Sequence, residues 1–225
     1  MNIGIIGGGG VGQTLGAALV ALGHKVTIGI RAATPEELAK SRAQAKPLAE
    51  WIAATGGKVT TMAQAAKGAK LIINATHGES SIAALTLAGA DNLAGKVLID
   101  VGNPLDFSQG MPPALSAAMS GHTSLGEQIQ AAFPSAKVVK AFNTIGAAIM
   151  VKPSSVAGEH DLLIAGNDAA AKDTVTTIAK GFGWQHVVDL GDIKGARAME
   201  AQVLLWMQVA QATGAWVHNI HIARG

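Results

Sequence analysis

Glycines at a fixed spacing stand near the start of the chain and predict a loop that binds a dinucleotide. Asn2–Ile6 reads as a short, mostly apolar strand, and it leads directly into the pattern Gly7-x-Gly9-x-x-Gly12. Gly7 permits a tight turn, Gly9 lets the backbone approach a pyrophosphate, and Gly12 lets the next helix pack closely on the strand. Free N–H groups at that helix start bind phosphate. The residues predicted to contact the cofactor here are Gly7, Gly8, Gly9, Gly10, Val11 and Gly12.

The residue at the end of the second strand indicates which dinucleotide binds. Sites selective for NAD place an Asp or Glu about 20 residues past the glycines, where it hydrogen-bonds the ribose. Here that place holds Arg31, and the first acid is Glu36. A guanidinium binds phosphate through a planar fork, so Arg31 favours the 2′-phosphate of NADP over a role as a solvated loop residue. Thr34 and Lys40 could add a hydroxyl and a second charge.

Three polar loops that follow predicted strands mark the place for the chemistry. They cover residues 74–81, 100–105 and 140–146. Ligands of an open parallel sheet lie beyond the carboxyl ends of its strands, so we expect these loops to converge over the nicotinamide. The residues predicted to contact the cofactor from them are Ala75, Thr76, Asn103 and Asn143, and Asn143 is also expected to form one wall of a flat pocket.

No acid–base pair is evident in these loops. His77 and Asn143 are the catalytic candidates, and His77 could exchange a proton with a reduced carbonyl. The alternative for His77 is a loop histidine that bonds its neighbours or caps the next helix. Asp100 and Asp189 are expected to cap the loops that follow them.

Apolar runs alternate with helical patterns and predict an α/β fold. We expect a Rossmann-like, doubly wound, mostly parallel sheet with helices on both faces and a long C-terminal helix. The predicted strands are 2–6, 25–29, 58–60, 70–75, 96–101, 137–142, 161–165 and 186–190. The predicted helices are 11–22, 35–45, 47–54, 81–87, 124–132, a short one ending at 150, 169–182 and about 194–215.

The organisation predicted is one NADP-binding domain over residues 1–225, with a nucleotide-binding core at 1–150 and further strands and the last helix at 151–225. Polar residues interrupt the last helix, so it does not read as a membrane span. Its apolar residues favour packing on the core or a homodimer interface. The residues expected at such an interface are Val203, Leu204, Trp206 and Met207.

Composition excludes several classes of function. The 225 residues carry a formal charge of +2 with no basic run, so neither nucleic acid nor a membrane is expected as a partner. Cysteine is absent, which excludes disulfides and thiolate sites. His218 and His221 lack acidic or cysteine companions, and we predict no metal site. His24 is expected in a structural turn. No secretory signal is visible, which predicts a cytoplasmic protein.

Several longer motifs together resemble the coenzyme F420-dependent NADP oxidoreductase family, and the cytosolic domain of the six-transmembrane ferric reductases is similar. The segments that carry this resemblance are 5–12, 23–31, 97–104, 133–143 and 189–193. The resemblance implies that NADP(H) exchanges a hydride with a flavin or deazaflavin stacked near the nicotinamide. It also implies cofactor contacts from Gly7, Gly9, Gly12, Arg31, Ala75, Asn103 and Asn143.

The chain departs from the family pattern at three places. Ile30 stands where the family often has a phosphate-binding Ser, the glycine loop is one residue shorter than in the archaeal enzymes, and Asn143 replaces their His. The leading hypothesis is an NADPH-dependent oxidoreductase acting on coenzyme F420 or another flavin-like acceptor. The alternatives are a reductase of a small imine or carbonyl compound, with His77 as proton donor, and a non-catalytic NADP-binding sensor.

Overall fold

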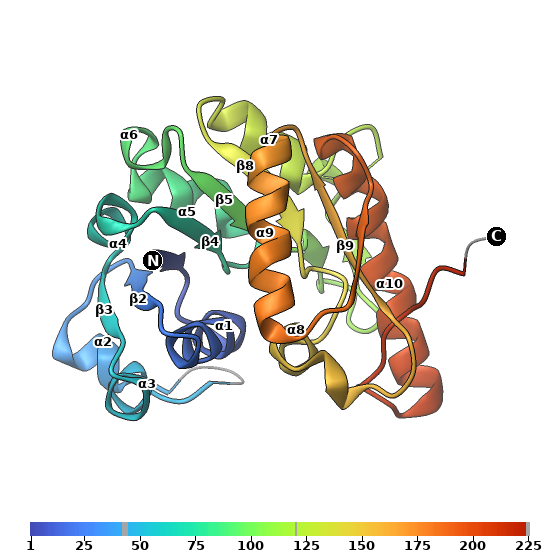
Figure 1. Ribbon diagram of the computed structural model, residues 1–225, viewed down its shortest axis with the longest axis horizontal. Coiled ribbons are helices and arrows are strands. Elements are labelled where there is room, and N and C mark those ends of the chain that lie inside the picture. The colour runs from blue at the N-terminus through green and yellow to red at the C-terminus, as the bar shows by residue number, and fades with distance from the viewer. Residues whose placement is uncertain (42–44, 120, 224–225) are drawn as a thin grey trace.

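The computed structural model describes residues 1–41, 45–119 and 121–223, in which eight strands form one sheet in the order β10-β9-β8-β5-β4-β1-β2-β3 (Figure 1). Each strand agrees with its predicted range to within one residue at either end. The strands are β1 (Asn2–Ile6), β2 (Lys25–Ile30), β3 (Lys58–Thr61), β4 (Leu71–Asn74), β5 (Val97–Asp100), β8 (Lys137–Ala141), β9 (Asp161–Gly166) and β10 (His186–Asp189).

The strand order reverses at β1, which pairs with β2 on one side and β4 on the other. This reversal is the point at which an open parallel sheet binds its ligand. Within this eight-stranded sheet all pairs are parallel except β8 with β9, which is antiparallel. An antiparallel neighbour needs no crossover helix, and only short helical turns lie between these two strands. The predicted fold, a mostly parallel doubly wound sheet, is confirmed.

The helices agree with most of the predicted ranges. The α-helices are α1 (Gly10–Ala21), α2 (Pro35–Ala39), α3 (Leu48–Thr55), α4 (Met62–Gly68), α5 (Ser81–Ala88), α6 (Ala90–Leu93), α7 (Leu125–Ala132), α8 (Ala147–Val151), α9 (Ala169–Phe182) and α10 (Ala196–Thr213). Short 3-10 turns are η1 (Gly78–Ser80), η2 (Ala117–Met119), η3 (Pro153–Ser155) and η4 (Ile193–Gly195). A small hairpin pairs β6 (Leu105–Asp106) with β7 (Ala114–Leu115).

One predicted helix is too long, and three elements were not predicted. The helix predicted over 35–45 ends at Ala39, because the backbone of Lys40 is extended; residues 42–44 lie outside the described part. Helices α4 and α6 and the hairpin were not predicted. The last helix, predicted to end near residue 215, ends at Thr213, where Gly214 adopts a left-handed conformation.

Two main apolar cores cover the two faces of the sheet, as a doubly wound topology requires, and a smaller one joins β9 and β10 to α10. One core joins the sheet to α1, α3, α8 and α9, and the other joins it to α4, α5 and α7. Neighbouring residues of one strand alternate between them: Ile5 belongs to the first core and Ile6 to the second. The central strands are therefore largely apolar on both faces, and most of their polar side chains stand at the strand ends.

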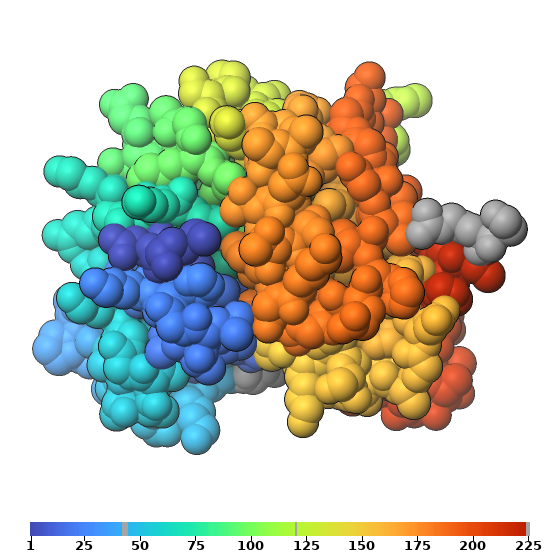
Figure 2. Space-filling view, in the orientation of Figure 1, coloured from blue at the N-terminus to red at the C-terminus, as the bar shows by residue number. Residues whose placement is uncertain are grey.

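The two longest helices near the C-terminus, α9 and α10, pack against the sheet. Helix α9 (orange) lies across the middle of the face seen in Figure 2, between the N-terminal segments in blue and teal and the segments near the C-terminus in deeper orange and red. Helix α10 packs against β9 and α7. It buries Val203 in this chain and leaves Leu205 57% exposed. No helix in the described part combines the length and the apolar character needed to cross a bilayer.

Candidate functional site

The glycine loop between β1 and α1 has the backbone geometry that its spacing predicts. Gly7 adopts a φ of 113°, which L side chains rarely reach, and thereby makes the turn out of β1. A Cβ added to Gly12 would lie 2.2 Å from the carbonyl oxygen of Gly7, so only glycine allows α1 this close to β1. A Cβ added to Gly9 would meet no atom within 4 Å. The open space beside Gly9 is the cradle that a bound pyrophosphate requires.

Arg31 lies beside this loop, at the carboxyl end of β2. It is exposed and lines a cavity of about 530 Å³ together with Gly7, Gly8 and Gly9. The preceding Ile30 is buried and packs toward Gly8, so it offers no polar group to a phosphate. The structure thus places one guanidinium next to the glycine loop, on the side of β2.

Thr34 and Lys40, the two further residues predicted as possible contacts of the 2′-phosphate, both bind Glu37 of α2. The Thr34 hydroxyl caps α2 by accepting from the Glu37 N–H at 3.3 Å, and the Lys40 ammonium pairs with the Glu37 carboxylate. Glu37 itself lines the cavity beside Arg31.

His77 shares a cavity with Arg31 rather than with the two asparagines. This cavity, of about 590 Å³, is lined by Gly9, Arg31, Ala75, Thr76 and His77, among others. The His77 side chain is exposed and caps no helix; within the described residues its ring makes no hydrogen bond. The β4 loop also lies against the β5 loop, because a Cβ added to Gly78 would lie 2.3 Å from the Asn103 carbonyl oxygen. That all three loops meet over the nicotinamide stays a prediction.

Asn103 and Asn143 lie together on the other side of the strand-order reversal. The Asn103 side-chain Nδ2 donates to the Asn143 backbone carbonyl at 2.7 Å, and the Asn143 Nδ2 donates to the Asn103 Oδ1 at 2.9 Å. The Asn143 Nδ2 also donates to the Met199 carbonyl of α10 at 3.0 Å. These bonds fix the amide of Asn143. Its Oδ1 is buried and has no donor among the described residues.

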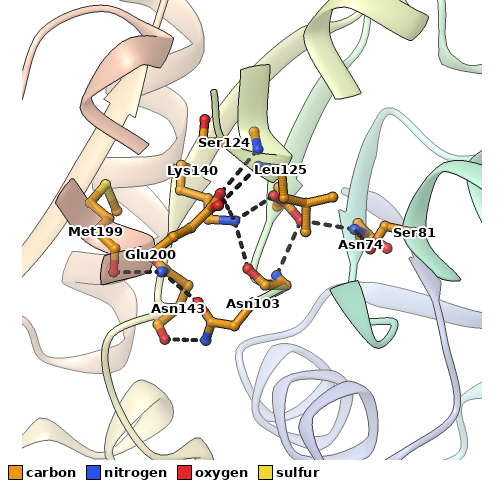
Figure 3. A network of polar contacts seen from close by, with 12 residues as sticks. Asn74, Ser81, Asn103, Ser124, Leu125, Lys140, Asn143, Met199 and Glu200 are labelled. Carbon is orange, nitrogen blue, oxygen red and sulfur yellow. Dashed lines mark hydrogen bonds and ion pairs between the residues drawn. The ribbon is translucent and has the colours of Figure 1, made fainter. Parts of the chain in front are cut away.

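Next to these asparagines lies a buried ion cluster that was not predicted from the sequence (Figure 3). The Lys140 ammonium contacts a carboxylate oxygen of Asp100 at 2.8 Å, one of Glu200 at 2.8 Å, and the Gly102 carbonyl at 2.6 Å. The side chains of Lys140 and Asp100 are fully buried, and that of Glu200 is 2% exposed. We call Asp100, Lys140 and Glu200 the ion cluster.

The sheet register brings two members of the ion cluster together. Asn74, Asp100 and Lys140 are neighbours across β4, β5 and β8, each near a carboxyl end. Asn74 donates to the Asp100 carboxylate at 2.8 Å, and the Gly102 N–H donates to it at 3.1 Å. Asp100 thus caps its following loop as predicted, and it binds a lysine as well.

The third member comes from α10 and is held by the start of α7. The Glu200 carboxylate accepts from the backbone N–H groups of Leu125 at 2.9 Å and Gly126 at 3.1 Å. These are the first free N–H groups of α7, where the helix dipole favours an anion. Glu200 therefore connects three elements, α10, α7 and β8.

Burial and charge act against each other on these groups. Burial alone would lower the pKa of Lys140, but the charges of Asp100 and Glu200 together raise that pKa. Burial raises the pKa of Glu200, while Lys140 acts in the opposite direction. Lys140 is thus an ammonium at neutral pH, fully engaged by acceptors, and it has no role open to it as a proton donor to a substrate.

The other residues discussed in the sequence, three histidines and Asp189, make contacts that stabilise the fold. The His24 ring bonds the N-terminal amine at 3.1 Å in the turn before β2, and Asp189 accepts from the Gly191 N–H at 2.9 Å, as a cap of its loop. The His218 ring stacks on Trp206 at 5.1 Å, and His221 lies 3.3 Å from Asp161. Within the described residues, no three His, Asp or Glu side chains are arranged to hold a metal ion.

Comparison with known proteins shows the family to which this chain is similar. Residues 2–104 match the family model "NADP oxidoreductase coenzyme F420-dependent". The F420-dependent NADP reductase of Methanocaldococcus jannaschii is 27% identical over 99% of this chain and 100% of its own length. The metalloreductase STEAP3 of Rattus norvegicus is 31% identical over 89% of this chain, which spans 36% of the length of that protein.

A solved structure covers the entire chain. It is the crystal structure of a candidate F420-dependent NADP-reductase from Arthrobacter sp. FB24, with 49% sequence identity, a TM-score of 0.93 and 100% coverage of both chains. At this identity and coverage the whole chain, and not only its glycine loop, shares the family's sequence and fold. The chain belongs to the F420-dependent NADP oxidoreductase family and is an NADP-dependent oxidoreductase.

Proposed function

We propose that this chain transfers a hydride between NADP(H) and a deazaflavin of the coenzyme F420 type, or a similar flavin. The observation that carries the proposal is the kind of group found at the Asn103–Asn143 end of the site. Asn103 and Asn143 form two hydrogen bonds with each other, and every charged group of the ion cluster is paired and buried. Such a site orients a ring but offers no acid to protonate a carbonyl.

Hydride transfer between two stacked rings suits a site of this kind. The reaction depends on proximity and orientation, and the proton that accompanies the reduced acceptor can come from water. The nicotinamide supplies the hydride when bound. This chain's residues hold the cofactor at two ends, with Arg31 toward the 2′-phosphate and Asn103 and Asn143 toward the nicotinamide.

The name of one relative supports this acceptor class, and the surroundings of His77 do not favour the alternative. The M. jannaschii relative is an F420-dependent NADP reductase by name. A carbonyl or imine reductase would need His77 as its proton donor, but His77 lines the cavity of Arg31. Within the described residues the His77 ring makes no hydrogen bond, so no carboxylate partner orients it as a proton donor.

Turnover of NADPH against a panel of acceptors tests the proposal. The panel contains coenzyme F420, FMN, FAD and a set of small ketones and cyclic imines, with loss of NADPH absorbance as the common readout. We expect turnover with a deazaflavin or flavin that persists in His77→Asn. Turnover confined to ketones or imines and abolished in His77→Asn would replace this proposal with the second enzyme class. Tight NADPH binding without turnover of any acceptor would favour a sensor.

A further inference from the structure

The two ends of the predicted cofactor site are built differently. The glycine loop and Arg31 lie on local segments next to β1 and β2. The opposite end consists of Asn103 and Asn143, which follow β5 and β8 and are joined by two reciprocal hydrogen bonds. Since the cofactor crosses the strand-order reversal with its pyrophosphate at the glycine loop, the asparagine end is the end for the nicotinamide.

Asn143 itself is held in an unusual way. The residue before it, Phe142, adopts a φ of 64°, a left-handed conformation that costs a non-glycine residue free energy. The Phe142 ring is buried and packs edge-on against Phe182 of α9 at 6.1 Å, which stabilises this conformation. The Asn143 Nδ2 has two acceptors, so its Oδ1 is aimed away from both and lacks a donor. A buried acceptor without a donor is costly unless a ligand supplies one.

The ion cluster supports each contact that fixes Asn143. Lys140 holds the carbonyl of Gly102, which directly precedes Asn103. Glu200 directly follows Met199, whose carbonyl accepts from Asn143. The Lys140 ammonium therefore binds both the Asn103 loop and α10. The two hydrogen-bond acceptors that hold the Asn143 amide, on that loop and on α10, both depend on it (Figure 3).

We infer that the ion cluster of Asp100, Lys140 and Glu200 is a positioning device for the nicotinamide end of the cofactor. Its ammonium sets the Asn103 loop and the Met199 carbonyl at the spacing that orients the Asn143 amide, and the free Oδ1 of Asn143 then receives an N–H of the nicotinamide carboxamide. The inference concerns cofactor binding alone and does not depend on which acceptor takes the hydride.

Two ligands that differ only by the nicotinamide test this inference. Calorimetric titration compares NADPH with 2′-phosphoadenosine 5′-diphosphoribose, which retains the 2′-phosphate and pyrophosphate. The main variant is Glu200→Gln, because a glutamine would direct N–H donors at Lys140 or at the backbone N–H groups of Leu125 and Gly126. We expect NADPH affinity to fall about tenfold, the size of one lost hydrogen bond, while affinity for the shorter ligand stays within about twofold.

Matched variants separate positioning from general damage. Glu127→Gln makes the same change in the surface ion pair of Glu127 with Arg197, which also joins α7 to α10, and it should alter neither affinity. Arg31→Ala should lower the affinities for both ligands. Equal losses for the two ligands in Glu200→Gln, or no loss for either, would overturn the inference.

Asn103→Ala keeps the inference testable if Glu200→Gln fails to fold, as judged by circular dichroism. This variant removes both reciprocal bonds to Asn143 and leaves the ion cluster intact. It should show the same selective loss of NADPH affinity. Losses of equal size for the two ligands would contradict the inference as well.

Discussion

Removal of the Lys140 ammonium should destabilise the protein severely, although no ligand is involved. In Lys140→Met the methionine fills much of the same space, but Asp100 and Glu200 lose a shared cation at 2.8 Å from each. Two carboxylates would then lie buried with only Asn74 and backbone N–H groups as donors. Deleting one partner of a buried ion pair costs about 3–5 kcal/mol, a large part of the stability of an ordinary domain at about 5–15 kcal/mol.

Urea unfolding followed by tryptophan fluorescence measures this loss, since Trp51 and Trp184 are buried. The matched control is Lys137→Met in the same strand, because Lys137 pairs with Asp168 at the surface and is 42% exposed. That variant should shift the unfolding midpoint little. The double variant of Lys140→Met with Glu200→Gln should be less destabilised than the two single losses added together, since it removes one of the orphaned charges. A loss below about 1 kcal/mol in Lys140→Met would refute the assignment of a buried, charged cluster.

Three changes in the cofactor site and one in pH complete the predictions. Gly9→Val should abolish NADPH binding and keep the fold, because its side chain enters space that no protein atom fills; normal binding would show that the loop was misread. Arg31→Ala should weaken NADPH relative to NADH by about 1.5–3 kcal/mol in titrations, and equal weakening would place Arg31 outside the phosphate site. His77→Asn should keep turnover with a flavin-like acceptor within about tenfold, or 1.4 kcal/mol, and a loss of several orders of magnitude at intact cofactor affinity would favour the carbonyl reductase. The Arg197 guanidinium holds the pKa of Glu127 below its usual value. The stability that this pair contributes is therefore present above about pH 4.5 and is lost as pH falls through the lowered pKa. The difference in unfolding free energy between the wild type and Glu127→Gln should shrink over the same pH range in acid titrations.

The sequence was informative wherever the structure depends on local spacing. Strands covered on both faces must be apolar at every position, so runs such as Leu71–Ile73 could be recognised without knowledge of their neighbours. Gly12 met a steric demand made by the carbonyl of Gly7, only a few positions away. Helix α4 was missed because its alanine-rich segment is short and has no long apolar side chain repeating at helical spacing. The hairpin was missed because each of its strands has two residues.

The ion cluster could not be assembled from the sequence, although a signal for part of it was present. Lys140 interrupts the apolar run 138–142, and a charge in a strand covered on both faces requires a buried partner. The sequence does not say which acid that partner is. Asp100 becomes its neighbour only because β5 pairs with β8, and Glu200 only because α10 packs beside α7.

The side chains at the Asn103–Asn143 end of the site depend on contacts between residues 1–150 and residues 151–225. Residues 1–150 include the glycine loop, Arg31 and both asparagines, and they read as a complete nucleotide-binding core. Yet the carbonyl that fixes the Asn143 amide belongs to Met199, and the second carboxylate on Lys140 belongs to Glu200. Both acceptors lie on α10, beyond the antiparallel strand β9. A chain cut after residue 150 would keep the phosphate-binding end but leave Lys140 with one carboxylate and Asn143 without its support from α10. If the nicotinamide binds beside Asn143, as we infer, the C-terminal segment is part of that end of the site.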